Sequence, residues 1–403
     1  MSSGRERYKQ SNEKKKRKSL NMGMDKILVF LFLIGILAYG IYTYIGFSNI
    51  KSENPLKNSN SDYYLLSDKK DDLEKTLIVF EEEYNEKEVI KYVYLYAENK
   101  EKGKSVLIYL PGWLEYRGLE KDFGTSVAIS AFRYAGEFLQ DGRGFEYAIW
   151  QLEQLFGSNI DQYIWFSAQS LSVFQDKLGT SSGDSVYAQY YNNGFEVSDE
   201  AFFFNSFVSK LGWFNLLMSS SKFKDSQAII YSSYPTLGNI VVELKNIHNS
   251  TLATRPYLID FSNAKYLSQQ VLFGTVGITN YINIPEYDAV WRGFVDGMID
   301  RELEKERARV EIYNGSGMSG YAAQYSRRVR NSGIEVVRYD NAPQDEEKTK
   351  FYVPNIEDFP NSLQIIQEIF PGTYEIIEGR PSFMTTGDIV IILGKDIPTV
   401  YSF

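Results

Sequence analysis

The sequence predicts an α/β protein with three parts: one N-terminal transmembrane helix, a mixed α/β domain and a small C-terminal α/β domain. Three observations support this prediction. Residues 27–47 form an apolar run of 21 residues without a charge. Strand-like and helix-like patterns alternate through residues 76–290, and a second strand–helix–strand order begins at Val310. Alternation of this kind is typical of sheets covered by helices.

The apolar run is long enough to cross roughly 30 Å of hydrocarbon as a helix. Tyr39, Tyr42 and Tyr44 lie near one end, where an aromatic belt is expected at the membrane interface. Residues 1–26 hold nine Lys or Arg against three acidic residues and are near +6, which predicts a cytoplasmic tail. We therefore expect a single-pass protein of the cell membrane that contacts lipid through residues 27–47 and has everything after residue 48 outside.

Two alternatives to this signal anchor are weaker. A cleaved signal peptide usually has an apolar region of about 7–15 residues followed by an A-x-A site. This run is longer, and no such site follows it. A buried core helix is disfavoured by the basic flank and by the length of the run.

Charge and composition exclude several classes of function. Because the whole chain carries −9 and the first 26 residues about +6, residues 27–403 are near −15. An acidic external part argues against nucleic acid as a partner, since such binding needs a basic face. The chain has no cysteine, which excludes disulfides and thiolate catalysis. The single histidine, His248, is predicted to be a surface or strand-end residue, so we expect no metal site and no cofactor.

Residues 48–75 are rich in Ser, Asn, Lys and Asp and predict a flexible stalk. The following mixed α/β domain, residues 76–290, is long enough for a sizeable core. Val, Ile and Tyr-rich runs predict strands at Thr76–Phe80, Lys91–Tyr96, Ser105–Leu110, Tyr163–Ser167, Ala228–Tyr231 and Tyr257–Phe261. Apolar residues at helical spacing predict helices at Gly144–Phe156, Leu171–Lys177, Glu200–Ser219 and Leu237–Asn246.

The order of these features resembles the LytR-CpsA-Psr (LCP) domain of bacterial cell-wall assembly. Two segments are the most similar. VLIYLPGWLEY (Val106–Tyr116) resembles the family's strand that ends in Pro-Arg-Asp, and Gly144–Gly179 resembles its helix-turn-strand stretch. The resemblance implies an α/β sandwich around a central sheet. It also implies an enzyme that transfers a glycopolymer from a polyprenyl pyrophosphate to peptidoglycan.

The residues that should carry this chemistry differ from the family pattern. Pyrophosphate transfer needs cations on the phosphates and acids that hold magnesium. Pro111-Gly112-Trp113 replaces Pro-Arg-Asp, Val89-Ile90-Lys91-Tyr92 replaces the Arg-x-Asp-Thr strand start, and the arginine-rich helix start reads SDEAFFFNSFVSKLG from Ser198. Loss of guanidinium groups removes both charge and bidentate geometry. We therefore predict a degenerate, non-catalytic member, a pseudoenzyme, whose altered pocket positions are Lys91, Gly112, Trp113, Phe202 and Phe204.

Those aromatic residues are expected to be ordinary core, with a lipid-chain lining as the alternative. Residues 291–309 begin apolar and end highly charged, which predicts a connecting helix with a solvated face. The C-terminal unit, residues 310–403, then predicts strands at Val310–Tyr313, Ile334–Tyr339, Lys350–Val353, Tyr374–Ile377 and Ile389–Leu393. Its predicted helices are Ser319–Asn331, with Ser319 as N-cap and Gly333 at the C-cap, and Ser362–Phe370.

Gly315, Gly317 and Gly320 spell G-x-G-x-x-G after a strand, and Asp340 stands where a dinucleotide fold places its ribose-binding acid. Only about 90 residues remain after Val310, however, which is too few for the two halves of such a fold and a substrate domain. The whole unit more closely resembles the LytR C-terminal domain, with Asn-Gly-Ser-Gly, Gly-x-Ala, a helix, a glycine and an Asn-Ala turn. That resemblance supplies no catalytic residues. The turn of Asn314, Gly315, Ser316, Gly317 and Gly320 offers N–H groups to a polymer, although a purely structural turn is favoured.

The sequence thus predicts a membrane-anchored extracytoplasmic envelope protein of a bacterium. Its expected partners are peptidoglycan or a wall glycopolymer and envelope-assembly proteins, which it binds or organises without chemistry. The alternative is a divergent LCP phosphotransferase that rebuilt its phosphate site from Lys91, Arg117, Arg133 and nearby acids. A signalling protein is a third class, but the short tail has no DNA-binding fold, and its lysines are explained by topology and anionic lipid.

Overall fold

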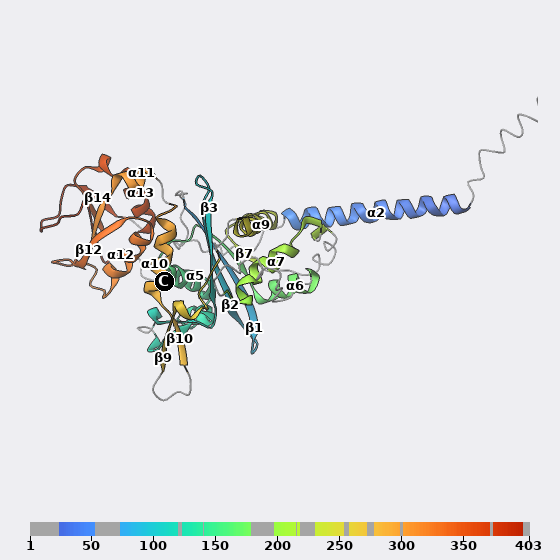
Figure 1. Cartoon of the computed structure of the whole chain (residues 1–403), viewed down its shortest axis with the longest axis horizontal. Coiled ribbons are helices and arrows are strands. Elements are labelled where there is room, and N and C mark those ends of the chain that lie inside the picture. The colour runs from blue at the N-terminus through green and yellow to red at the C-terminus, as the bar shows by residue number, and fades with distance from the viewer. Residues whose placement is uncertain are drawn as a thin grey trace, which may run out of the picture.

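A computed structural model of the chain describes residues 24–52, 73–119, 123–139, 141–178, 197–214, 216–217, 230–253, 258–271, 278–298, 301–370 and 374–397. Figure 1 shows a central domain with a sheet seen nearly edge-on. A long helix leaves one side of this domain, and the C-terminal domain lies on the opposite side. The three predicted parts are therefore arranged in a row.

In the described part of the chain, the central sheet has six strands in the order β7-β6-β1-β2-β3-β8. The antiparallel strands β1, β2 and β3 form its middle, and β6 and β8 run parallel to β1 and β3. The strand bounds are β1 Glu74–Tyr84, β2 Lys87–Asn99, β3 Lys104–Pro111, β6 Gln162–Phe166, β7 Ile230–Ser232 and β8 Leu258–Asp260.

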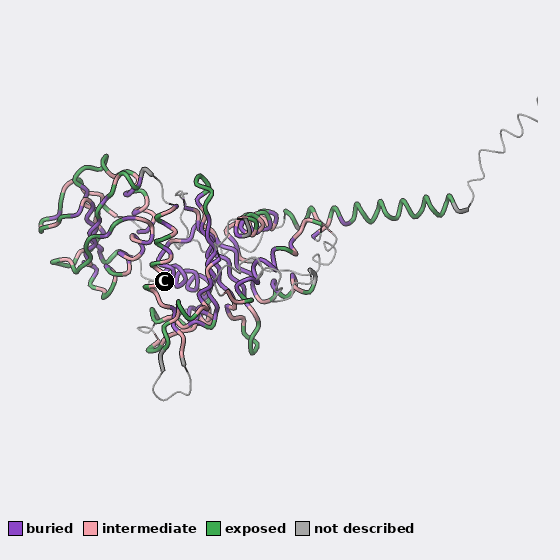
Figure 2. The backbone as a smooth tube through the Cα atoms, viewed as in Figure 1, coloured by how far each residue is buried: buried purple, intermediate pink, exposed green. Residues whose placement is uncertain are grey.

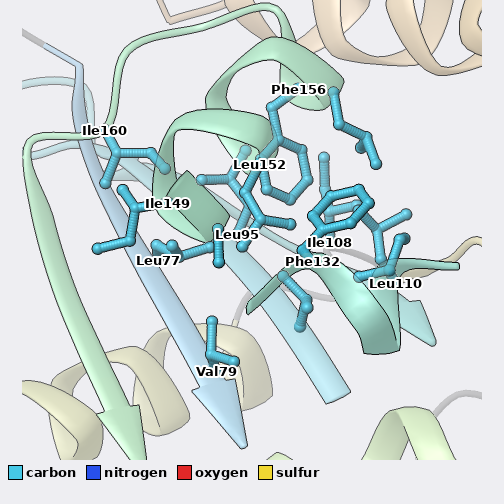
Figure 3. Close-up of a cluster of buried hydrophobic side chains, with 14 of the residues drawn as sticks. Leu77, Val79, Leu95, Ile108, Leu110, Phe132, Ile149, Leu152, Phe156 and Ile160 are labelled. Carbon is cyan, nitrogen blue, oxygen red and sulfur yellow. The ribbon is translucent and has the colours of Figure 1, made fainter. Parts of the chain in front are cut away.

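Both faces of this sheet are buried, because side chains alternate between two apolar layers. Leu77 and Val79 of β1 point into one core, whereas Ile78 and Phe80 point into the other. Figure 3 shows the first core, where sheet residues meet Ile149, Leu152 and Phe156 of a helix. Helices α4 (Phe132–Leu139), α5 (Gly144–Phe156) and α10 (Ile284–Val295) cover this face, and α6 (Ala168–Leu178), α7 (Phe203–Lys210) and α9 (Leu237–Ala253) cover the other.

A second, smaller sheet was not foreseen from the sequence. Within the described residues it has four strands in the order β5-β4-β10-β9, of which two are only two residues long. Their bounds are β4 Glu115–Tyr116, β5 Val127–Ala128, β9 Leu267–Val271 and β10 Ile278–Ile282. Strands this short carry no periodicity that a sequence pattern can detect.

The C-terminal domain is a separate five-stranded sheet, in the described residues, with the order β12-β11-β15-β13-β14. All its neighbouring strands are parallel except β13 and β15. The strands are β11 Arg309–Asn314, β12 Glu335–Asn341, β13 Lys350–Val353, β14 Glu375–Glu378 and β15 Ile389–Leu393. Helices α11 (Arg301–Glu306), α12 (Tyr321–Asn331) and α13 (Pro360–Ile369) contribute to its main core.

The N-terminal apolar helix is α2, Met24–Ser52. Its stretch Lys26–Asn49 is long and apolar enough to cross a membrane. Figure 2 shows that α2 is exposed along most of its length and meets the central domain only near its C-terminal end. Residues 48–52, for which we predicted the start of a stalk, are still helical. The rest of the predicted stalk up to residue 72 lies outside the described residues.

Most predicted elements are confirmed, including α5, β13 and β15 at the predicted residues. Three local predictions were wrong. The predicted long helix Glu200–Ser219 is a 3-10 turn, Asp199–Phe202, followed by α7, which ends at Lys210 before Leu211 and Gly212. Ser319 is not the N-cap of α12, because that position belongs to Gly320 at φ +91°. The predicted connecting helix is also divided, with residues 291–295 inside α10 and a separate helix α11.

Candidate functional site

The altered pocket positions meet in one region of the central sheet. The Gly112 N–H donates to the carbonyl of Lys91 (2.9 Å), which joins the end of β3 to β2. The start of α7 packs on the same strand: the rings of Tyr92 and Phe203 lie 4.7 Å apart, and the Phe204 N–H donates to the Tyr94 hydroxyl (3.3 Å). Positions more than 100 residues apart in the sequence are thus neighbours.

Aromatic side chains fill this region. Phe202 and Phe204 are buried in the core between α7 and the sheet, as predicted for ordinary core residues. Phe80 stacks on Phe166 at 4.9 Å, and Phe203 meets Phe80 edge-on at 5.1 Å. The Tyr94 hydroxyl of this cluster has an internal partner, since it donates to the Glu200 carbonyl (3.1 Å). Burial raises the pKa of Tyr94 well above its usual value, so this hydroxyl stays neutral.

Trp113 does not belong to this cluster. Its side chain is 46% exposed, whereas Gly112 beside it is buried. The expectation that Trp113 is an ordinary core residue, like Phe202 and Phe204, was therefore wrong. Gly112 and Trp113 both lie in the turn that follows β3, in which the Leu114 N–H donates to the carbonyl of Pro111 (3.2 Å), and this turn directs Trp113 toward the surface.

Gly112 cannot be replaced by a larger residue on this backbone. A Cβ atom at this position would lie 2.0 Å from the carbonyl oxygen of Ile90. The close approach follows from a β-bulge, because Phe80 pairs with Tyr92 and Glu81 with Ile90, which leaves Lys91 as the extra residue of β2. An arginine therefore has no room at position 112 on this backbone.

Lys91 is bound by an acid on its own side of the sheet. Its Nζ atom lies 2.5 Å from Oε2 of Glu82, in an ion pair that is partly exposed. Burial lowers the pKa of Lys91, but the hydrogen bonds and charges of Glu82 and Tyr92 together outweigh it, so the pKa is raised overall. Lys91 is charged at neutral pH, and its charge is compensated locally.

Arg133 of α4 is bound by two other acids. Its Nη1 atom donates to both oxygens of the fully buried Glu81 (3.0 and 2.8 Å) and to Oε2 of Glu88 (3.0 Å). Burial raises the pKa of Glu81, although Arg133 acts in the opposite direction. Along β1, Glu81 shares the face of Leu77 and Val79, whereas Glu82 shares the face of Ile78 and Phe80. Arg133 and Lys91 are therefore held by acids that point to opposite faces of the sheet.

Arg117, the third cation of the alternative enzyme hypothesis, is an exposed residue whose guanidinium lies over the ring of Tyr281 at 4.2 Å. It thus contacts the smaller sheet through β10. The three cations do not converge on one pocket.

One cleft of about 650 Å³ opens beside the β1–β2 hairpin and α6. Phe203 and Tyr92 reach it, so it adjoins the altered pocket positions. Its charged lining, within the described residues, is mainly acidic: Glu81, Glu82, Glu83, Glu86 and Glu88 against Lys87 and Lys91. A surface of this sign repels phosphate groups.

The glycine-rich turn after β11 is held by its own hydrogen bonds. Oδ1 of Asn314 accepts from the Ser316 N–H (3.2 Å) and hydroxyl (2.6 Å), and its Nδ2 donates to the Met318 carbonyl (2.6 Å). The Gly315 N–H donates to the carbonyl of Leu393 (2.9 Å). Gly317 and Gly320 adopt φ of +76° and +91°, which favours glycine. The groups named here have structural partners inside the domain.

His248 lies within α9, not at a strand end or on an open surface. Burial, together with Lys245, lowers its pKa to about 4, so the ring is neutral at physiological pH. No cluster of three or more His, Cys, Asp or Glu with metal-binding geometry occurs among the described residues.

Sequence reasoning missed a polar junction between the two external domains. Helix α12 of the C-terminal domain lies against the C-terminal end of α5 and against α10. Arg327 donates to both oxygens of Asp288 and to the carbonyls of Gln154 (2.6 Å) and Leu155 (2.7 Å). The indole Nε1 of Trp291 donates to the Asn331 carbonyl (2.8 Å) in the same junction.

A second ion pair lies deeper in this junction. Nη2 of Arg328 is 3.4 Å from Oε2 of Glu153, and both side chains are almost fully buried. Burial raises the pKa of Glu153 to about 8, against the opposing effect of Arg328. The only available sequence signal was the basic pattern RRVR within a predicted helix, which reads equally well as a solvated face.

Comparisons with known proteins agree with the C-terminal assignment. The family model of the LytR cell envelope-related transcriptional attenuator, LytR_C, matches residues 307–396. The chain therefore carries a LytR_C domain at its C-terminus, and the dinucleotide hypothesis is not supported. A comparison with curated proteins gives no match.

Several solved structures are similar to this chain at low identity. Protein gbs0355 from Streptococcus agalactiae is 11% identical, with 56% of this chain and 88% of that chain covered and a TM-score of 0.35. TagV of B. subtilis is also 11% identical, with 57% and 99% covered and a TM-score of 0.35. A structure of TagT bound to LI-WTA is 9% identical, with 62% and 97% covered and a TM-score of 0.34.

Proposed function

We propose that this chain is a membrane-anchored extracytoplasmic protein of the cell envelope that binds or organises wall polymer, or the proteins that assemble it, without transferring polymer itself. The LytR_C domain supports the envelope assignment. The apolar helix α2, preceded by a basic segment, supports a membrane anchor with the two α/β domains outside. The middle domain, in this proposal, is a degenerate LCP-like domain.

The proposal that the protein does not transfer polymer rests on which residues occupy the altered pocket positions and on how the nearby cations are paired. Stabilising a transferring phosphoryl group requires cations that point at one place. Here the positions that meet are occupied by Gly112 and a buried aromatic cluster, and the nearby Lys91 and Arg133 are paired with acids on opposite faces of the sheet. The charged residues that line the adjoining cleft are mainly glutamates. This arrangement supports a scaffold more than an active site.

The arrangement of the parts also fits a wall-facing role. α2 leaves the central domain on the side of α7 and α9. The C-terminal domain lies on the opposite side, next to α5 and α10 (Figure 1). With α2 in the membrane, the central domain holds the LytR_C domain away from the bilayer. Because α12 is bound to α5 and α10 through buried polar contacts, this orientation is fixed.

Wall binding is tested by co-sedimentation of the full-length protein, in detergent micelles, with purified bacterial cell walls. Walls that keep their glycopolymer are compared with walls from which it has been stripped. Sedimentation with both indicates peptidoglycan as the ligand, and sedimentation with intact walls alone indicates the glycopolymer. If the protein stays in the supernatant in both cases, wall binding is refuted and membrane-bound assembly proteins become the better partners.

The divergent-transferase alternative needs a separate assay. The full-length protein is incubated with Mg²⁺, peptidoglycan and a glycopolymer carried on a polyprenyl pyrophosphate, and release of polyprenyl phosphate is measured. We expect no release above the protein-free rate. Release that disappears in both Lys91→Ala and Arg133→Ala would establish the enzyme and overturn our proposal.

A further inference from the structure

The C-terminal end of α2 is packed against the central domain. Thr43 is already buried, although it lies well inside the apolar stretch Lys26–Asn49. One turn later the ring of Phe47 meets Trp213 edge-on at 5.6 Å. The domain therefore begins to touch α2 before the apolar stretch has ended.

The second contact is made by α9. At Gly238, an added Cβ atom would lie 2.7 Å from the carbonyl oxygen of Lys51. Lys51 also places its Nζ atom over the Trp213 ring at 5.6 Å. The last two turns of α2 are thus fixed to Trp213 and to the start of α9, so the direction of α2 fixes the orientation of the domain.

Helix geometry sets the depth of this contact. A hydrocarbon layer of roughly 30 Å takes up about 20 residues of helix at 1.5 Å each. Counted from Ile27, the first residue after the cytoplasmic Lys26, such a span ends at Gly46 or Phe47. Phe47, and with it Trp213, therefore lies at the outer boundary between hydrocarbon and headgroups.

The surface around this contact carries unpartnered apolar side chains. Phe214, directly after Trp213, is 71% exposed. Val242 is 47% exposed and stands one helical turn after Gly238, on the face of α9 that meets α2. Lys51 and Lys245 lie on the same side, at positions suited to anionic headgroups. Aromatic residues beside lysines at this depth are typical of a membrane interface.

We propose that the surface formed by Trp213, Phe214 and Val242 rests in the outer headgroup layer beside α2 and makes a second, interfacial contact with the lipid bilayer. This inference rests on the proposed role of α2 as a membrane anchor. The central domain then stands directly on the membrane with α7 and α9 downward, and the LytR_C domain points away from it. The occupant is lipid and not a protein, because the anchor helix itself delivers this surface to the bilayer.

The chain has no cysteine, which makes single labels unambiguous. Phe214→Cys and Val242→Cys are prepared in the full-length protein, labelled with a nitroxide and reconstituted into vesicles of phosphatidylglycerol and phosphatidylethanolamine. Collision with oxygen, which concentrates in lipid, is compared with collision with a water-soluble nickel complex. Leu37→Cys, 65% exposed in the middle of α2, reports hydrocarbon, and Met384→Cys, 89% exposed in the C-terminal domain, reports water.

At positions 214 and 242 we expect nickel collision several-fold lower than at position 384, with oxygen collision between the values at 384 and 37. If 214 and 242 behave like 384 while 37 is in lipid, the interfacial contact is refuted and the anchor remains. If position 37 itself is in water, the anchor and the inference fail together. If nickel collision at positions 214 and 242 stays low when phosphatidylglycerol is omitted, the contact is made by the apolar side chains and not by the lysines.

Discussion

Arg327 of α12 and Asp288 of α10 form a two-pronged ion pair across the junction of the two external domains, with Nε–Oδ2 and Nη2–Oδ1 distances of 2.8 Å. The same guanidinium also binds the last carbonyls of α5, where the helix dipole favours a cation. One side chain from the C-terminal domain thus binds two helices of the central domain, α5 and α10. The junction makes the two domains one unit.

Removing this side chain should destabilise the unit. We expect Arg327→Ala to lower the free energy of unfolding by about 2–4 kcal/mol, because Asp288 and two carbonyls lose their partner in a mostly buried setting. Urea denaturation in detergent micelles measures the loss. Arg338→Ala is the control, since its pair with Asp340 is exposed and should leave stability unchanged. Equal effects of the two variants would contradict the role of the junction.

Gly157 provides a second test of the junction. It ends α5 at φ +60°, and an added Cβ would lie 2.7 Å from the guanidinium carbon of Arg327 and 2.7 Å from Nδ2 of Asn331. Gly142 has a similar φ of +78° but open space around it. Gly142→Ala should therefore cost only the backbone strain, about 1 kcal/mol, and Gly157→Ala clearly more. If the two changes cost the same, close approach of α12 does not constrain position 157.

Glu153 should make stability depend on pH. Its pKa in the folded protein is raised by burial to about 8, from an ordinary value of 4.5. The folded state therefore binds more protons than the unfolded state between these values, and stability falls as pH rises through this window. Measured from pH 5 to pH 8.5, the decline should be shallower in Glu153→Gln, which cannot ionise. An unchanged slope in that variant would show that Glu153 is already charged in the folded protein.

For the degenerate LCP-like domain that we propose, the tight approach at Gly112 predicts that one substitution will not give enzymatic activity. Gly112→Ala should destabilise the protein by about 2 kcal/mol or more, because its Cβ would meet the Ile90 carbonyl at 2.0 Å. Gly112→Arg should be worse and should gain no polymer transfer. Gly293→Ala in α10 is the matched control, since its surroundings are open and alanine favours a helix. A stable and active Gly112→Arg protein would refute the bulge argument.

Local patterns explain why much of the fold could be predicted. In the helix Gly144–Phe156, apolar residues recur at helical spacing. The strands around Ile78, Tyr94 and Ile108 are continuous runs of residues that favour β-structure. Local residue preferences and periodicity are therefore enough to predict these elements. Helix α7 shows the limit of this reasoning. Its apolar pattern continues past Lys210, but the backbone turns at Leu211 and Gly212.

The pocket positions show the same division. The resemblance selected Gly112, Lys91 and Phe204, and the structure brings these positions to one region of the central sheet. The sequence could not show that Trp113 points outward from the turn after β3, nor that the bulge at Lys91 leaves no room beside Gly112. A bulge shifts one strand by one residue, and no short pattern records it.

By itself, the sequence determined the apolar helix, the acidic and cysteine-free outer part and the LytR_C domain. These depend on composition, on periodicity or on a motif within a few residues. Only the tertiary structure decided that Lys91 and Arg133 bind acids on opposite faces of a sheet, that α12 closes on α5, and that α2 ends against Trp213. The physical reason is that each of these pairings joins segments that are distant in the chain, so no local pattern records it.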